Sequence, residues 1–313
     1  MSKKIISLAA GMAMIGGVAM SDTPKVAADI SPVHSLVSRV MLGVGTPDLI
    51  VQAGASPHGY TLRPSEAKAL QDAQMVFWMG ESLSPWMEGA LDTLSSDATI
   101  ITLLERDETI LMEFREGALF EEHDHDDHGD EKHDDHDDHG HDSYDPHAWL
   151  SPDNAKIWLN LIASQLSIVD PENAGTYFAN AAAARSEIEA LTTEVNSLLE
   201  PVRGKKFIVF HDAYQYFEKA FDLSASGAIS LGDASKPSPA RIAEIQGRIQ
   251  EESIDCVLSE PQFNKGLVAT VMAGSKAKTS VIDPLGVGLK PGPDLYSELI
   301  RNMTKTLVDC FES

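Results

Sequence analysis

The chain has 313 residues, of which 43% are apolar, so it is long enough for two domains with substantial cores. Its formal net charge is −24, which argues against a basic nucleic-acid-binding surface and favours cationic ligands. Apart from residues 5–20, no stretch approaches the roughly 18 consecutive apolar residues of a membrane-spanning helix.

The first residues have the pattern of a secretory signal. Lys3 and Lys4 precede the uncharged run 5–20, and small residues around Ala19 offer a cleavage position near residue 20. We therefore expect residues 1–21 to be a signal peptide and the mature protein to be exported. The alternative is a buried N-terminal helix.

Residues 22–168 alternate between apolar, strand-like segments and helical segments. This alternation predicts an N-terminal α/β lobe with a parallel sheet. The predicted strands are 25–30, 48–51, 75–79 and 98–103, and the predicted helices begin near residues 31, 64, 85 and 151.

A tract at 121–142 interrupts this lobe. Its residues are 12 Asp or Glu, 7 His, 2 Gly and 1 Lys, without one apolar side chain, so we expect a disordered loop. Imidazoles bind zinc, copper and nickel, which makes the tract a candidate accessory metal site. Its histidines are His123, His125, His128, His133, His136, His139 and His141. The alternative is a solvated acidic linker.

A long helix is predicted within residues 169–203, because apolar residues recur there at helical spacing. These residues are Phe178, Ala182, Ile188, Leu191, Val195 and Leu198. Almost 30 residues of helix are more than one small domain needs. The helix is therefore either a rigid connector between two lobes or half of a helical hairpin packed on a single domain.

Residues 204–313 repeat the alternation and predict a C-terminal α/β lobe. The predicted strands are 206–210, 226–230, 254–260 and 279–283, and the predicted helices are 213–221, 238–252, 265–275 and 294–311. The chain has two cysteines, Cys256 and Cys310. In an exported protein an even number suggests one disulfide. The alternative is two buried thiols.

Four histidines lie outside the tract, and three of them follow predicted strands or border a loop. In open α/β sheets, ligands bind beyond the carboxyl ends of the strands. His211 and Asp283 lie at such ends, His58 lies in the turn after 48–51, and His147 lies between the tract and a helix. Three imidazoles with a carboxylate or water are a common zinc shell. His34 falls within a predicted helix, which indicates a structural role.

Five segments resemble the periplasmic zinc-binding proteins of ABC importers, in particular the high-affinity type with a His-rich loop. They are GASPHGYTLRPSEAKALQDAQMVFWMG, DPHAWLSPDNAKI, VFHDAYQYFEKAFDL, SEPQFN and VIDPLG. The resemblance implies two (β/α) lobes with mostly parallel sheets, joined by one long helix, with the metal in the cleft between them. It also implies His58, His147 and His211 as ligands. Some members have Glu where this chain has Pro57, so Asp283 or a water is the expected fourth ligand.

The function implied by this resemblance is capture of Zn²⁺ in the periplasm and delivery to an ABC importer permease, by a monomer without enzymatic activity. Periplasmic zinc chaperones are further expected partners. One alternative is a zinc buffer or chaperone without a transporter. Another is a manganese importer component, but related manganese proteins carry a carboxylate at the position of His211. A zinc hydrolase would need a general base such as Glu260 or Asp212, but the chain has no HExxH motif.

Overall fold

The computed structural model describes residues 23–115, 117, 120, 144–230, 237–263 and 265–312. The predicted signal peptide, residues 1–21, and the tract 121–142 with its seven histidines lie outside these ranges. None of the helices in the described ranges combines the length and the apolar character needed to span a membrane.

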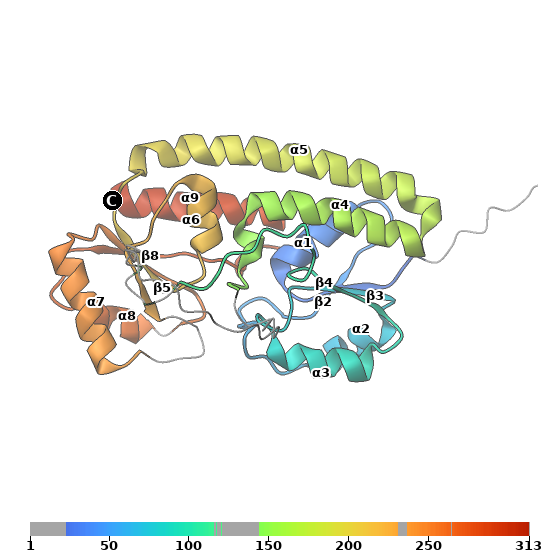
Figure 1. Ribbon diagram of the computed structural model, residues 1–313, viewed down its shortest axis with the longest axis horizontal. Helices are drawn as coiled ribbons and strands as arrows, with labels where there is room; N and C mark the ends of the chain where they lie inside the picture. The colour runs from blue at the N-terminus through green and yellow to red at the C-terminus, as the bar shows by residue number, and fades with distance from the viewer. Residues whose placement is uncertain are drawn as a thin grey trace, which may run out of the picture.

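The first sheet consists of four parallel strands in the order β2-β1-β3-β4. The strands are β1 (Val26–Ala28), β2 (Asp48–Leu49), β3 (Met75–Trp78) and β4 (Thr99–Thr102). Helices cover both faces: α2 (Pro64–Asp72) and α3 (Pro85–Leu94) pack on one, and α1 (Ser31–Val40) packs on the other (Figure 1). All four residues of β3 are buried, because successive side chains point to opposite faces and both faces are covered.

The second sheet repeats the first, with four parallel strands in the order β6-β5-β7-β8. The strands are β5 (Phe207–His211), β6 (Ala228–Ser230), β7 (Cys256–Ser259) and β8 (Lys278–Val281). The helices that follow these strands are α6 (Gln215–Phe221), α7 (Pro239–Glu251), α8 (Lys265–Val271) and α9 (Leu295–Glu312). The predicted α/β fold with two parallel sheets is confirmed.

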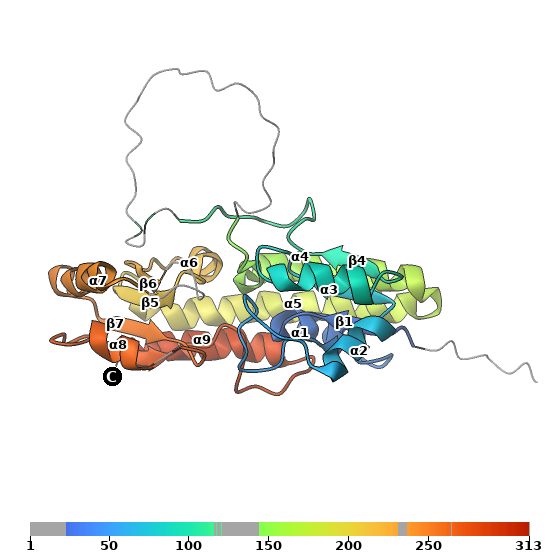
Figure 2. The same cartoon turned by 90° about the horizontal axis from the view of Figure 1, so that it is seen from below.

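Three long helices lie beside the sheets, and the longest of them extends from one sheet to the other (Figure 1). Helix α4 (Pro152–Val169) is capped at its N-terminus by Ser151, whose hydroxyl accepts the backbone N–H of Asn154 at 3.2 Å. Helix α5 (Ala174–Leu199) has 26 residues, or about 39 Å at 1.5 Å per residue. It packs against α4 near its start and against α9 near its end (Figures 1 and 2). The predicted long helix is therefore both half of a hairpin and a connection to the second sheet.

The apolar residues that predicted this helix do not all lie on its buried face. Ile188, Leu191 and Val195 are buried, but Phe178 and Leu198 are 50% and 47% exposed and Ala182 is also exposed. The buried stripe is Tyr177, Ala181, Ala184, Ile188, Leu191, Val195 and Leu199. The positions of α4 and α9 determine which side of α5 is buried. Apolar residues one position away from the buried stripe therefore face solvent.

One hydrophobic core joins the two sheets. The same cluster of packed, buried side chains contains Phe77 of β3, Leu191 of α5 and Phe207 of β5. The predicted disulfide is confirmed and ties Cys256 of β7 to Cys310 of α9, with Cα atoms 6.0 Å apart. The shared core resists a large rearrangement of one sheet relative to the other, whereas the disulfide fixes α9 to the second sheet.

Candidate metal site

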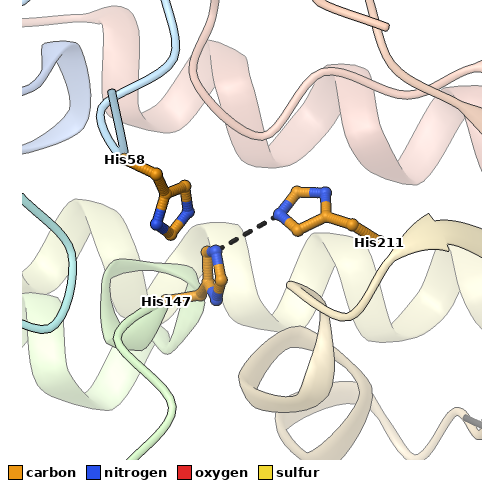
Figure 3. Close-up of side chains that lie close together, drawn as sticks. All are labelled: His58, His147 and His211. Carbon is orange, nitrogen blue, oxygen red and sulfur yellow. Dashed lines mark hydrogen bonds between the residues drawn. The ribbon is translucent and has the colours of Figure 1, made fainter. Parts of the chain in front are cut away.

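Three histidines from distant parts of the chain converge between the two sheets (Figure 3). His58 lies in the loop between β2 and α2, and His147 immediately precedes the short 3₁₀ turn η1 (Ala148–Leu150). His211 is the last residue of β5. His147 and His211 are buried and His58 is half-buried. His58, which follows a strand of the first sheet, and His147, which lies just before α4, therefore face His211 at the end of a strand of the second sheet.

The spacing of the imidazole nitrogens suits a tetrahedral ion. His147 Nε2 and His211 Nε2 are 3.3 Å apart, and one ring nitrogen from each of the three histidines lies within 4.8 Å of the others. In a tetrahedral zinc shell with Zn–N bonds of about 2.05 Å, ligand nitrogens are about 3.3 Å apart. The His147–His211 pair already has this separation, and a modest approach of His58 would complete a three-nitrogen face.

Two buried carboxylates orient these rings. His147 Nδ1 lies 2.7 Å from Asp145 Oδ1, and His211 Nδ1 lies 2.6 Å from Glu260 Oε1. A carboxylate accepts a hydrogen bond, so each Nδ1 carries the proton and each Nε2 keeps its lone pair for a cation. These two roles were missed by sequence reasoning. The Asp-Pro-His spacing at 145–147 was a usable signal for Asp145, whereas Glu260 is brought to His211 only by the pairing of β5 with β7.

The surroundings of the histidines are negatively charged and poorly solvated. Burial acts to raise the pKa of Asp145, but the interactions with His147 outweigh burial and hold this pKa below its ordinary value. Burial and the nearby carboxylates of Glu260 and Asp283 raise the pKa of Tyr214 well above its ordinary value. Such surroundings favour a bound cation.

The cavity at the histidines has a volume of only about 10 Å³. Its lining includes the three imidazoles, Trp149 and Phe263. This volume is enough for one ion or one water molecule. Pockets for organic ligands have roughly 300–1,000 Å³, so the cavity does not suit an organic substrate.

The structure does not group Asp283 with the three histidines. Its carboxylate lies in the turn after β8 and accepts the backbone N–H groups of Leu285, Gly286 and Val287 at 3.1, 2.9 and 2.6 Å. His34 lies apart, buried in α1, with its Nε2 3.0 Å from the carbonyl oxygen of Pro47. That contact agrees with the structural role expected for His34.

Comparisons with known proteins agree with this architecture. Residues 26–310 match the family model described as "Zinc-uptake complex component A periplasmic". The high-affinity zinc uptake system protein ZnuA of Brucella abortus (strain 2308) is 44% identical over 303 residues, covering 91% of each chain. ZnuA of Paracoccus denitrificans (strain Pd 1222) is 44% identical over 318 residues, covering 97% of this chain and 96% of its own.

Solved structures share the fold at low sequence identity. A crystal structure of ZnuA has a TM-score of 0.75 with 22% identity, covering 93% of this chain and 100% of the other. The solute-binding protein FpvC of Pseudomonas aeruginosa, solved in complex with Mn²⁺, has a TM-score of 0.76 with 20% identity, covering 93% and 99%. Two parallel α/β lobes joined by a long helix place the chain in the class of solute-binding proteins. Within that class, the chain belongs to the family of the periplasmic zinc-uptake complex component A.

Proposed function

We propose that this chain captures Zn²⁺ between its two sheets through His58, His147 and His211. It is a periplasmic zinc-binding protein of an ABC zinc importer, and its partner is the importer's membrane permease. The observation that carries the ligand assignment is the 3.3 Å separation of the two Nε2 atoms, each on a ring whose Nδ1 is held by a carboxylate.

Zinc is the proposed cargo because the donor set is nitrogen. Manganese is a harder cation that prefers oxygen ligands, whereas imidazole suits zinc. Copper and nickel also bind imidazole, so discrimination against them depends on geometry and on metal supply. The family description and the names of the relatives, which refer to zinc uptake, support this choice.

For the fourth ligand we propose Asp283, with a water molecule as the alternative. A carboxylate has about four acceptor positions, and the three backbone N–H groups occupy three of them. One position therefore remains for a metal ion without loss of the turn.

The seven histidines of tract 121–142 are proposed to form a weaker, accessory zinc site. The composition of the tract predicts a disordered loop, and such a loop loses conformational freedom with each metal it binds, which lowers its affinity. The tract would then collect zinc for the site between the sheets or respond to the zinc level.

Further proposals complete this assignment. The chain acts without catalysis, and the 10 Å³ cavity supports that view. It functions as a monomer, exchanges zinc with periplasmic chaperones, and reaches the periplasm after cleavage near residue 20.

The proposed domain division has an N-terminal lobe at 22–168 and a C-terminal lobe at 204–313, connected by residues 169–203. If the chain were a buffer without a transporter, it would not co-purify with a zinc importer permease.

Competition calorimetry with Zn²⁺ tests the ligand assignment. Replacing His58, His147 or His211 by Ala should weaken tight binding by more than about 100-fold, since outer partners of metal ligands alone contribute roughly 10–100-fold. Deletion of residues 121–142 is the matched comparison, and it should remove weak sites while keeping the tight one. Loss of the tight site in that deletion would place the main site in the tract instead.

A further inference from the structure

The two chain segments that border tract 121–142 are fastened to each other and to the second lobe. Glu113 and Tyr144 form an antiparallel bridge, and the N–H of Asp145 donates to the carbonyl of Met112 at 2.8 Å. The hydroxyl of Tyr216 accepts the N–H of Met112 and donates to the carbonyl of Asp145, both at 2.9 Å. Since Tyr216 belongs to α6, the chain on either side of the tract rests on the helix that follows His211.

Arg115 adds an ionic contact at the same place. Its guanidinium donates from Nε to both carboxylate oxygens of Asp212 at 3.1 Å, and its Nη2 also contacts Asp212. It donates from Nη1 and Nη2 to Glu218 at 2.9 and 3.0 Å. The Arg115 side chain is 17% exposed and both carboxylates are 6% exposed, so all three charges are largely removed from water.

The ion pairs of Arg115 and a neighbouring hydrogen bond from α6 lie next to the two halves of the candidate metal site. Asp212 is the residue directly after the ligand His211, so its position fixes the end of β5. On the other side, Asp145 orients His147 through Nδ1 and also accepts a hydrogen bond from Gln215 of α6 at 3.2 Å. The contacts around Arg115 therefore connect the segment that carries His147 with the segment that carries His211. They influence the distance between these two imidazoles.

We propose that Arg115 is a positioning residue for the metal site, whose ion pairs with Asp212 and Glu218 hold His147 and His211 at ligand distance and slow the release of zinc. Without Arg115, two buried carboxylates would face each other with no neutralising cation, and the end of β5 would shift or admit water. This role rests on the proposed zinc-binding function. It goes beyond that function because Arg115 touches neither the metal nor its ligands.

The release rate of zinc tests this role. The full-length protein is loaded with Zn²⁺ and mixed rapidly with excess chelator, and a Co²⁺-loaded sample reports ligand geometry by its visible absorption. Arg115→Gln should release zinc at least about tenfold faster, the effect expected of an outer partner of a metal site, and should alter the Co²⁺ spectrum. Arg115→Lys should restore part of the slow release, since it keeps the charge and loses the bidentate geometry.

Arg301→Gln is the control. Arg301 also forms a bidentate pair, with Glu194 at 2.9–3.0 Å, but this pair lies between α9 and α5, away from the histidines, and its side chains are 45% and 44% exposed. Its loss should leave both the release rate and the Co²⁺ spectrum unchanged. If Arg115→Gln does not fold, the double change Arg115→Gln with Glu218→Gln, which removes one charge of each sign, should show the same fast release.

A folded Arg115 variant with the release rate and Co²⁺ spectrum of the unaltered protein would overturn the positioning role. Failure of the unaltered protein to retain zinc would instead overturn the proposed function. The two failures are thus distinguished by the unaltered protein alone.

Discussion

At the residue scale, the site is organised by pairs of one imidazole and one carboxylate. The three histidines could be predicted from the sequence because two of them follow strands and the motifs around all three resemble a known family. The Asp-Pro-His spacing offered a signal for the orienting role of Asp145. The roles of Glu260 and Arg115 could not be predicted in this way, since they depend on which segments approach one another in the folded chain. Asp283 follows a strand as expected, but its carboxylate is engaged with backbone N–H groups, and its role as a ligand stays a prediction.

The orienting carboxylates provide the first prediction. Glu260→Gln and Asp145→Asn should each weaken zinc affinity by roughly 10–100-fold, because an amide raises imidazole basicity less than a carboxylate does. Glu252→Gln is a control, since Glu252 pairs with Arg248 and Lys206 instead of a histidine. Calorimetric competition measures all three affinities, and unchanged affinity in both site variants would show that the carboxylates do not tune the metal.

At the element scale, the order of the described strands and helices followed from apolar alternation, but some predicted elements were too long: 254–260 was predicted where β7 is Cys256–Ser259, and 265–275 where α8 is Lys265–Val271. The apolar residues of α5 predicted a helix, but they did not show which side of it is buried, because that depends on the positions of helices α4 and α9. Residues such as Phe178 and Leu198 are apolar and exposed, so composition alone could not separate them from the buried stripe.

Two leucines of α5 test the observed phase. Leu191→Ala should lower the free energy of unfolding by about 2–5 kcal/mol, because it removes a fully buried side chain from the shared core. Leu198→Ala, on the same helix and 47% exposed, should change it by less than about 0.5 kcal/mol. Urea unfolding followed by circular dichroism measures both, and equal losses would contradict the assigned phase.

The disulfide between β7 and α9 also acts at the scale of single elements. Cys256 lies opposite Phe207 at the start of β5, whereas His211 lies at the end of that strand. Replacing both Cys256 and Cys310 by Ala should therefore lower stability by about 4 kcal/mol, the loop-closure value for a separation of 54 residues, without altering zinc affinity. Thermal unfolding and zinc titration of this variant check the two statements separately, and a large loss of affinity in the folded variant would contradict the second.

At the scale of the whole molecule, the two sheets share one core and are spanned by α5. The two-lobe architecture was predictable because the alternation of strands and helices occurs twice, with a long helix between. The continuity of the core was not predictable, since it arises from packing among segments far apart in the chain, so that Phe77 of the first sheet and Phe207 of the second belong to one cluster.

A shared core implies limited motion between the lobes. Superposing zinc-free and zinc-loaded crystal structures on the first sheet should leave the Cα atoms of the second sheet displaced by no more than about 1 Å, the range seen in pre-organised binding proteins. Solution scattering with and without zinc should agree. A closure of many ångströms on binding would mean that α5 and the shared core bend, contrary to their proposed role.

The most direct test of the central proposal is a zinc-loaded crystal structure with diffraction data collected on both sides of the zinc absorption edge. We predict one main anomalous peak, about 2.0–2.1 Å from a ring nitrogen of each of His58, His147 and His211, with an oxygen of Asp283 or a water as the fourth ligand. A fully occupied peak elsewhere, with any of these three histidines outside bonding distance of the metal, would contradict it.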